Sequence, residues 1–158
     1  MRTISRIKDM KQKLVGFNDE VLHSVAQEVP FNNTEIPQDV IDSFEGEKML
    51  GLSAPQIGIP YRCSVCHFST GVEVIINPEL ELEGDTTIIS TERCLSFPNI
   101  ECKIKRHTKV KLTYFNKSWN KCEKILEGLD AIIAQHEYDH LDGITMINRA
   151  IYKTFKRR

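Results

Sequence analysis

Apolar residues recur at helical spacing in two short segments of the first third of the chain. Between residues 19 and 29 they stand at Val21, Leu22, Val25, Ala26 and Val29. This spacing predicts a helix over Asp19–Val29, which Pro30 ends. After a loop, a second helical pattern opens at Pro37 and ends near Gly46.

The middle of the chain, residues 61–113, changes to the alternation that is typical of half-buried strands. Asn77-Pro78 interrupts the pattern, Gly84-Asp85 predicts a turn, and residues 116–120 predict a hairpin turn. The strands that we expect are residues 72–76, 79–83, 86–90 and 109–114, and the segment from Cys63 is typical of the start of another.

A longer helical pattern follows over residues 128–141. It places on one face Leu129, Ile132, Ile133, His136 and His140. Asp142-Gly143 ends it. The order of helices, then strands, then one helix favours an α+β fold over alternating βαβ units.

The composition is that of one globular domain without a strong charge. The chain has 158 residues, of which 41% are hydrophobic and 27% charged, and its net charge is -1. It therefore gives no reason to expect a membrane or a specific nucleic-acid partner. We expect a basic leader over residues 1–16, a catalytic domain over 17–150 and a short basic tail over 151–158. Basic ends are typical of solvated tails, and proximity to the ribosome is the alternative.

The chain has five cysteines and no secretory signal, so we expect reduced thiols or metal ligands rather than disulfides. Cys63-Ser64-Val65-Cys66-His67 matches the pattern of covalent haem attachment. That chemistry belongs to exported proteins, and residues three apart on the expected strand point to opposite faces. Haem attachment is therefore disfavoured, while a redox pair or second metal site stays open.

The most informative motif is His136-Glu137-Tyr138-Asp139-His140. Residues four apart share a helix face, so both imidazoles can bind one metal ion, and Glu137 can act on a water beside it. The alternative is a solvated helix with scattered His and Glu, which the apolar neighbours Ile132 and Ile133 disfavour.

A catalytic site of this kind needs a third protein ligand. Met146 stands where metzincins carry a histidine, and no Asp or Glu follows Asp142, so the ligand must lie upstream. Thiolates suit such metals, and Cys94 is the candidate, although a single cysteine is more often a small buried side chain.

Three segments, in order, resemble the motifs of the peptide deformylase family. They are Gly51-Leu52-Ser53-Ala54-Pro55-Gln56-Ile57-Gly58, Glu92-Arg93-Cys94-Leu95-Ser96 and Gln135-His136-Glu137-Tyr138-Asp139-His140-Leu141-Asp142-Gly143. The resemblance implies an antiparallel β-sheet wrapped around a central metal-binding helix. It also implies hydrolysis of the formyl group from N-formyl-methionine on newly made chains, with formate released.

The same resemblance implies the roles of individual residues. The metal ligands are Cys94, His136 and His140, and the metal is Fe²⁺, with Zn²⁺, Ni²⁺ or Co²⁺ as substitutes. Glu137 acts as general base, while the Gln56 amide and the Leu95 backbone N–H stabilise the oxyanion. Candidate substrate-binding residues are Leu50, Gly51, Glu92, Arg93, Leu129, Ile132 and Ile133.

Two positions depart from the family pattern, because Arg93 and Met49 stand where glycines are usual. We expect both to narrow or recharge the mouth of the substrate cleft. The alternatives for the whole chain are a metallohydrolase for another small acyl-amide and a non-catalytic metal-binding protein. We expect a monomer in the cytoplasm of a bacterial or phage-infected cell, with an organelle as the alternative.

Overall fold

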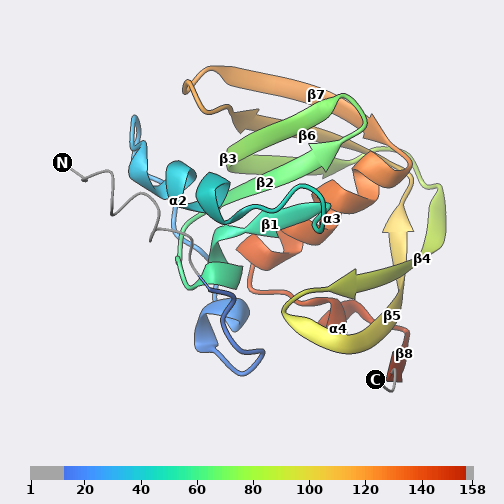
Figure 1. The fold of residues 1–158 in the computed structure, drawn as a ribbon. Coiled ribbons are helices and arrows are strands. Elements are labelled where there is room, and N and C mark those ends of the chain that lie inside the picture. The colour runs from blue at the N-terminus through green and yellow to red at the C-terminus, as the bar shows by residue number, and fades with distance from the viewer. Residues whose placement is uncertain (1–12, 156–158) are drawn as a thin grey trace.

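The computed structural model describes residues 13–155, so most of the expected leader and the last three residues lie outside the described part. Two antiparallel sheets flank one long helix (Figure 1). The larger sheet has the order β1-β2-β3-β6-β7, and its strands are Gly51–Ser53, Cys63–Phe68, Gly71–Leu82, Lys109–Phe115 and Lys121–Glu127. The smaller sheet has the order β4-β5-β8, with strands Thr87–Cys94, Phe97–His107 and Tyr152–Phe155.

Helix α3, Leu129–Leu141, lies between the two sheets and carries the histidine motif (Figure 1). The other helices are the 3-10 turns η1, Glu20–His23, and η2, Ala54–Ile57, and the α-helices α2, Glu35–Ser43, and α4, Met146–Arg149. The α+β class and the antiparallel pairing are confirmed, although the strands form two sheets rather than one.

Residues from α3 are buried on both sides, because each side meets a sheet. Ala131, Ile133 and Ala134 pack into the core of the larger sheet. His140 and Leu141 are also buried, whereas Leu129 is 58% exposed. Leu129, Ile132, Ile133 and His136 line one cavity, which agrees with the face expected for them, but residues outside this face, such as Ala134 and Asp139, are buried as well.

The helix predicted over Asp19–Val29 is wrong except for one turn. Asp19 caps η1 by accepting a hydrogen bond from the Val21 N–H, but the chain then becomes extended at Ser24. The Ala26 N–H donates to the Leu141 carbonyl, a bond to the end of α3 that a continuing helix would not make. Tertiary backbone bonds thus replace the helical ones, while the predicted apolar side chains Leu22, Ala26 and Val29 are still buried.

The Asn77-Pro78 interruption does not end a strand as predicted but places a bulge inside β3. The register against β6 shifts between Ile76 and Glu79. Asn77 has a φ of 48° and its side-chain amide exchanges two hydrogen bonds with the backbone of Val29. The bulge therefore attaches the N-terminal segment to the larger sheet.

The strands β1, β5, β7 and β8, the 3-10 turn η2 and the helix α4 were not predicted from the sequence. Strand β7 completes the hairpin whose turn at residues 116–120 is confirmed by the Asn116–Asn120 backbone bond. Helix α4 and strand β8 follow α3, and β8 pairs with β5. Residues 152–155 of the expected basic tail are therefore a strand of the smaller sheet.

Gly143, which ends α3, is required for both its conformation and its lack of a side chain. Its φ is 71°, and a Cβ atom there would lie 2.8 Å from backbone atoms of His23 and Ser24. Gly84 has a similar φ of 68° but nothing within 4 Å. We expect Gly84→Ala to cost about 1 kcal/mol, from backbone strain alone. Gly143→Ala should cost about 2 kcal/mol more, because it also forces two backbones apart.

Urea unfolding of both variants measures the difference directly. Equal losses of unfolding free energy in the two variants would show that the contact between η1 and the end of α3 is not tight.

Candidate metal centre

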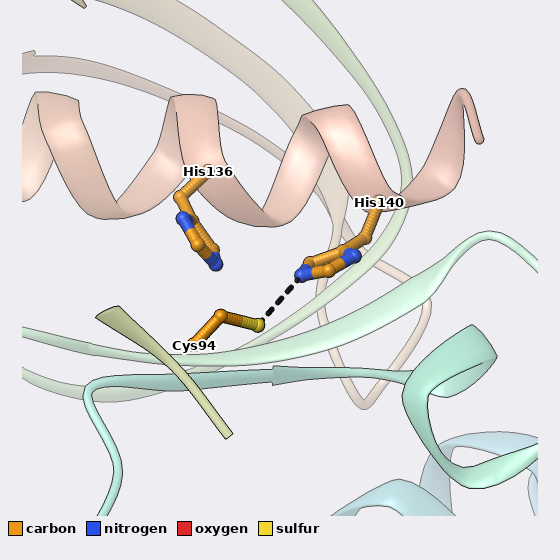
Figure 2. Close-up of side chains that lie close together, drawn as sticks. All are labelled: Cys94, His136 and His140. Carbon is orange, nitrogen blue, oxygen red and sulfur yellow. Dashed lines mark hydrogen bonds between the residues drawn. The ribbon is translucent and has the colours of Figure 1, made fainter. Parts of the chain in front are cut away.

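Three potential metal ligands converge from a strand and a helix. His136 and His140 project from successive turns of α3, and Cys94 ends β4 (Figure 2). Their ligand atoms all lie within 4.8 Å of one another, and Cys94 Sγ is 3.5 Å from His140 Nε2. Tetrahedral coordination with bonds of about 2.0–2.3 Å separates ligand atoms by roughly 3.5 Å, so the cluster is of the right size for one ion.

Cys94 reaches the helix because β4 ends in a tight hairpin. The register shifts between Glu92 and Cys94, and Cys94 then pairs with Phe97, which leaves Leu95 and Ser96 at the turn. The Cys94 side chain is only 8% exposed. The bulge therefore aims the thiol into the space between the sheet and α3.

The ring nitrogens of the two histidines have different surroundings. His136 Nδ1 donates to Glu92 Oε1 over 2.9 Å, which turns Nε2 toward the cluster. Burial lowers the pKa of His136, but contacts with Cys94 and Glu92 outweigh burial and raise it, so a metal ion would compete with a proton there. Burial holds the pKa of His140 well below its usual range, which keeps this imidazole neutral.

Glu137 lies beside the three potential metal ligands, and its carboxylate forms no ion pair with another described residue. Burial raises the pKa of its carboxyl to about 7, against the opposing effect of His136. Oε1 is buried and has no hydrogen-bond partner among the described residues. A carboxyl that titrates near neutral pH can both accept and return a proton.

Gly51 leaves the space that Glu137 occupies. A Cβ atom on Gly51 would lie 2.5 Å from Glu137 Oε2, closer than real side chains come. The strand β1 thus approaches α3 through a glycine, and its position fixes where the carboxylate can lie.

The Gln56 side chain is held by both ends of its amide. Its Oε1 accepts from the Ser53 backbone N–H and hydroxyl over 2.9 and 3.0 Å. Its Nε2 contacts Ser96 Oγ at 3.1 Å and Cys94 Sγ at 3.5 Å. Because the carbonyl end is engaged by Ser53, the amide donor faces the metal cluster.

A buried ionic network surrounds the cluster. Arg106 donates to both oxygens of Glu92 at 2.8 Å and to Asp139 Oδ2 at 2.7 Å, and Arg149 adds two bonds to Asp139. Burial raises the pKa of Glu92, but the bonds from Arg106 and His136 outweigh it and lower the pKa to about 2. Glu92 thus stays charged and orients His136.

The contacts that Arg106 and Asp139 make in this network were not predicted from the sequence. Arg106 lies 14 positions after Glu92 in β5, and only the register of the β4–β5 hairpin could have pointed to the pair. The substrate-binding role expected for Glu92 does not match its contacts, because Arg106 and His136 occupy both of its oxygens.

A cavity of about 790 Å³ opens over the cluster. Its wall includes His136, Glu137, Cys94, Gln56 and Leu95. It also includes every residue expected to bind substrate, namely Leu50, Gly51, Glu92, Arg93, Leu129, Ile132 and Ile133. Met49 lines it too, while its side chain packs against the buried residues of the core around Leu52 and Val65.

Cys63 and Cys66 take no part in the site. Both are buried in β2, and they belong to different core clusters, as expected for residues three apart on a strand. Their burial and separation leave no room for the haem-attachment interpretation. Among the described residues, Cys94, His136 and His140 form the only cluster suited to a metal ion.

Comparison with known proteins identifies the family. The polypeptide deformylase family model matches residues 11–156. The peptide deformylase of Aquifex aeolicus is 35% identical, over 94% of this chain and 92% of its own length. A crystal structure of the Thermotoga maritima peptide deformylase superposes with a TM-score of 0.83 at 33% identity, covering 89% of this chain and 98% of that one.

A probable peptide deformylase from Synechococcus phage S-SSM7 has the same fold, with a TM-score of 0.79 at 28% identity over 87% of this chain and 99% of that one. The family expected from the three motif-like segments is thereby confirmed. The chain belongs to the polypeptide deformylase family and is a metal-dependent hydrolase that removes the N-formyl group from newly synthesised polypeptides.

Proposed function

We propose that Cys94, His136 and His140 bind one divalent metal ion and that the native ion is Fe²⁺, with Zn²⁺, Ni²⁺ or Co²⁺ as substitutes. The observation that carries this proposal is the approach of the three ligand atoms to within 4.8 Å. One thiolate and two imidazoles form a donor set that suits borderline metals. A divalent ion in this position would lower the pKa of a water toward neutrality and polarise the formyl group.

Glu137 is the proton carrier in this proposal. Its unpartnered Oε1 takes the proton of the attacking water and later gives it to the amine that leaves. The raised pKa, about 7, suits both transfers because neither state of the carboxyl is strongly favoured.

Gln56 and Leu95 stabilise the negative charge that develops on the formyl oxygen. The Gln56 amide is turned toward the cluster by Ser53, and the Leu95 N–H lies in the hairpin turn beside Cys94. Donors that are fixed before the reaction need no reorganisation, and one such donor is typically worth about 10²–10³ in kcat.

The apolar part of the cavity binds the methionine side chain. Leu129, Ile132 and Ile133 supply one wall from α3, and Leu50 lies at the mouth, where it is 54% exposed. Gly51 lines the same cavity and leaves room for the Glu137 carboxylate beside it. The polar cluster at one end and the apolar wall at the other match the two ends of a formyl-methionyl group.

The described residues include no helix long and apolar enough to cross a membrane. We place the enzyme in the cytoplasm of a bacterial or phage-infected cell, as a monomer acting on nascent formyl-methionyl chains. The net charge of -1 supports the absence of a specific nucleic-acid partner. Proximity to the ribosome would rest on the basic residues near the two ends of the sequence, most of which lie outside the described residues.

The first prediction of the proposed function concerns the reaction. The protein should release formate from a formyl-Met peptide with kcat/KM at least roughly 100-fold above acetate release from the acetyl-Met analogue, because one added methyl must fit beside fixed polar groups. Glu137→Gln should lose about 10²–10⁴ in kcat with its metal content unchanged. Glu81→Gln, which removes an exposed carboxylate on β3, is the matched control. Comparable rates on both peptides would favour a hydrolase for another acyl-amide.

The second prediction concerns Gly51. Gly51→Ala places a methyl 2.5 Å from Glu137 Oε2 and must displace this carboxylate. We expect at least a ~10-fold fall in kcat, because misplacing a catalytic group by about 1 Å is costly. Metal content should stay unchanged. Gly16→Ala is the control, since a Cβ atom there meets nothing within 4 Å. Full activity of Gly51→Ala would contradict the role of Glu137.

The third prediction concerns Glu92. Glu92→Gln removes the charge that orients His136 and balances Arg106. We expect metal affinity to fall about 10–100-fold, as measured by competition with a chelator. Glu123→Gln, at a site on β7 that forms an ion pair with Lys111 of β6, should leave affinity unchanged. Unaltered affinity in Glu92→Gln would restrict this residue to a structural role.

A further inference from the structure

The mouth of the cavity carries two exposed cations. Lys48 precedes β1, Arg93 lies in β4, and their side chains are 76% and 68% exposed. Of the exposed residues that line the cavity in the described chain, these two are the charged ones. A peptide that enters the cavity therefore meets positive charge at the rim.

Each cation has an acidic partner that is less exposed than itself. Arg93 pairs with Glu101, whose side chain is 19% exposed, and Lys48 pairs with Glu45, whose side chain is 31% exposed. Each acid is thus less accessible than its cation, although Glu101 also lines the cavity. The two ion pairs orient the cations and partly offset their positive potential, but Lys48 and Arg93 stay exposed to solvent.

Arg93 is fixed more firmly than an ordinary surface arginine. Its Nε and Nη2 groups donate to the same oxygen of Glu101 over 2.9 and 2.7 Å. These contacts use one edge of the guanidinium, and the Nη1 donors remain for another acceptor. A side chain held in this way loses little further entropy when it binds a ligand.

The acceptor best suited to such a guanidinium is a carboxylate, which can take two parallel N–H bonds. Arg93 directly precedes Cys94, and both line the same cavity. A substrate whose formyl group lies at the metal centre extends by about 3.3–3.6 Å per residue. The side chains that follow methionine are therefore the first to reach the rim.

We propose that Arg93, together with Lys48, makes the enzyme favour formyl-methionyl chains with an acidic side chain in the second or third position. This preference rests on the proposed function, because it requires the formyl group to occupy the centre formed by Cys94, His136 and His140. It gives the departure from glycine at position 93 a role in substrate selection.

The test compares kcat/KM for formate release from formyl-Met-Glu-Ala and formyl-Met-Ala-Glu with their glutamine analogues. At low ionic strength we expect the glutamate peptide of at least one pair to be favoured by about 5-fold, the upper range for an exposed ion pair. The lysine analogue should be the poorest substrate. In about 0.5 M NaCl the ratio should approach one, because salt screens exposed charges.

Three variants separate the charge of Arg93 from general effects. Arg93→Gln should bring the glutamate-to-glutamine ratio close to one, and Arg93→Lys should keep part of it. Lys105→Gln removes an exposed cation from β5 outside the cavity and should leave the ratio unchanged.

A wild-type ratio of one at both positions, or a ratio that survives Arg93→Gln, would overturn the preference while leaving the deformylase reaction intact. Failure to release formate from any of the peptides would instead contradict the proposed function, and the preference with it.

Discussion

The buried contact of Arg106 with Glu92 and Asp139 is the interaction on which the site depends. It joins β5 to β4 and to α3, and all three side chains are almost excluded from solvent. Burying these charges is costly, and apolar replacements of the whole group are often no less stable, so stability alone does not explain them. What the network secures is position: it places the β4–β5 hairpin against α3, so that the Cys94 thiol meets two histidines of the helix.

The chemistry of the site depends on Glu137, a buried carboxyl that is not hydrogen-bonded to the arginines of this network. Glu92 is saturated by Arg106 and His136 and stays charged, with a pKa of about 2. Glu137, whose Oε1 has no hydrogen-bond partner among the described residues, has a pKa raised by burial to about 7. Two buried carboxylates thus have different roles, because only Glu92 is hydrogen-bonded to a guanidinium. Glu92 orients the ligand His136, and Glu137 carries protons.

Local patterns in the sequence were sufficient for the elements that are stabilised locally. The helix bearing His136 and His140, its end at Gly143 and the hairpin turn at residues 116–120 were all predicted correctly. The Asp19–Val29 helix was not, because backbone bonds to the end of α3 compete with helical ones. The residues alone pointed to a third ligand upstream of the helix with Cys94 as the candidate, and the family resemblance decided in its favour. No local sequence pattern predicts the role of Arg106, since its contacts are set by the register of β4 against β5 and by the packing on α3.

The most direct test of the account quantifies metal and activity on one sample. The protein is purified without oxygen, its metal content is determined, and formate release from a formyl-Met tripeptide is measured before and after chelation. The account predicts about one Fe²⁺ per chain, activity that chelation abolishes and Fe²⁺ or Ni²⁺ restores, and loss of the bound ion in Cys94→Ala. A protein that carries a full complement of metal at this centre and releases no formate would contradict it.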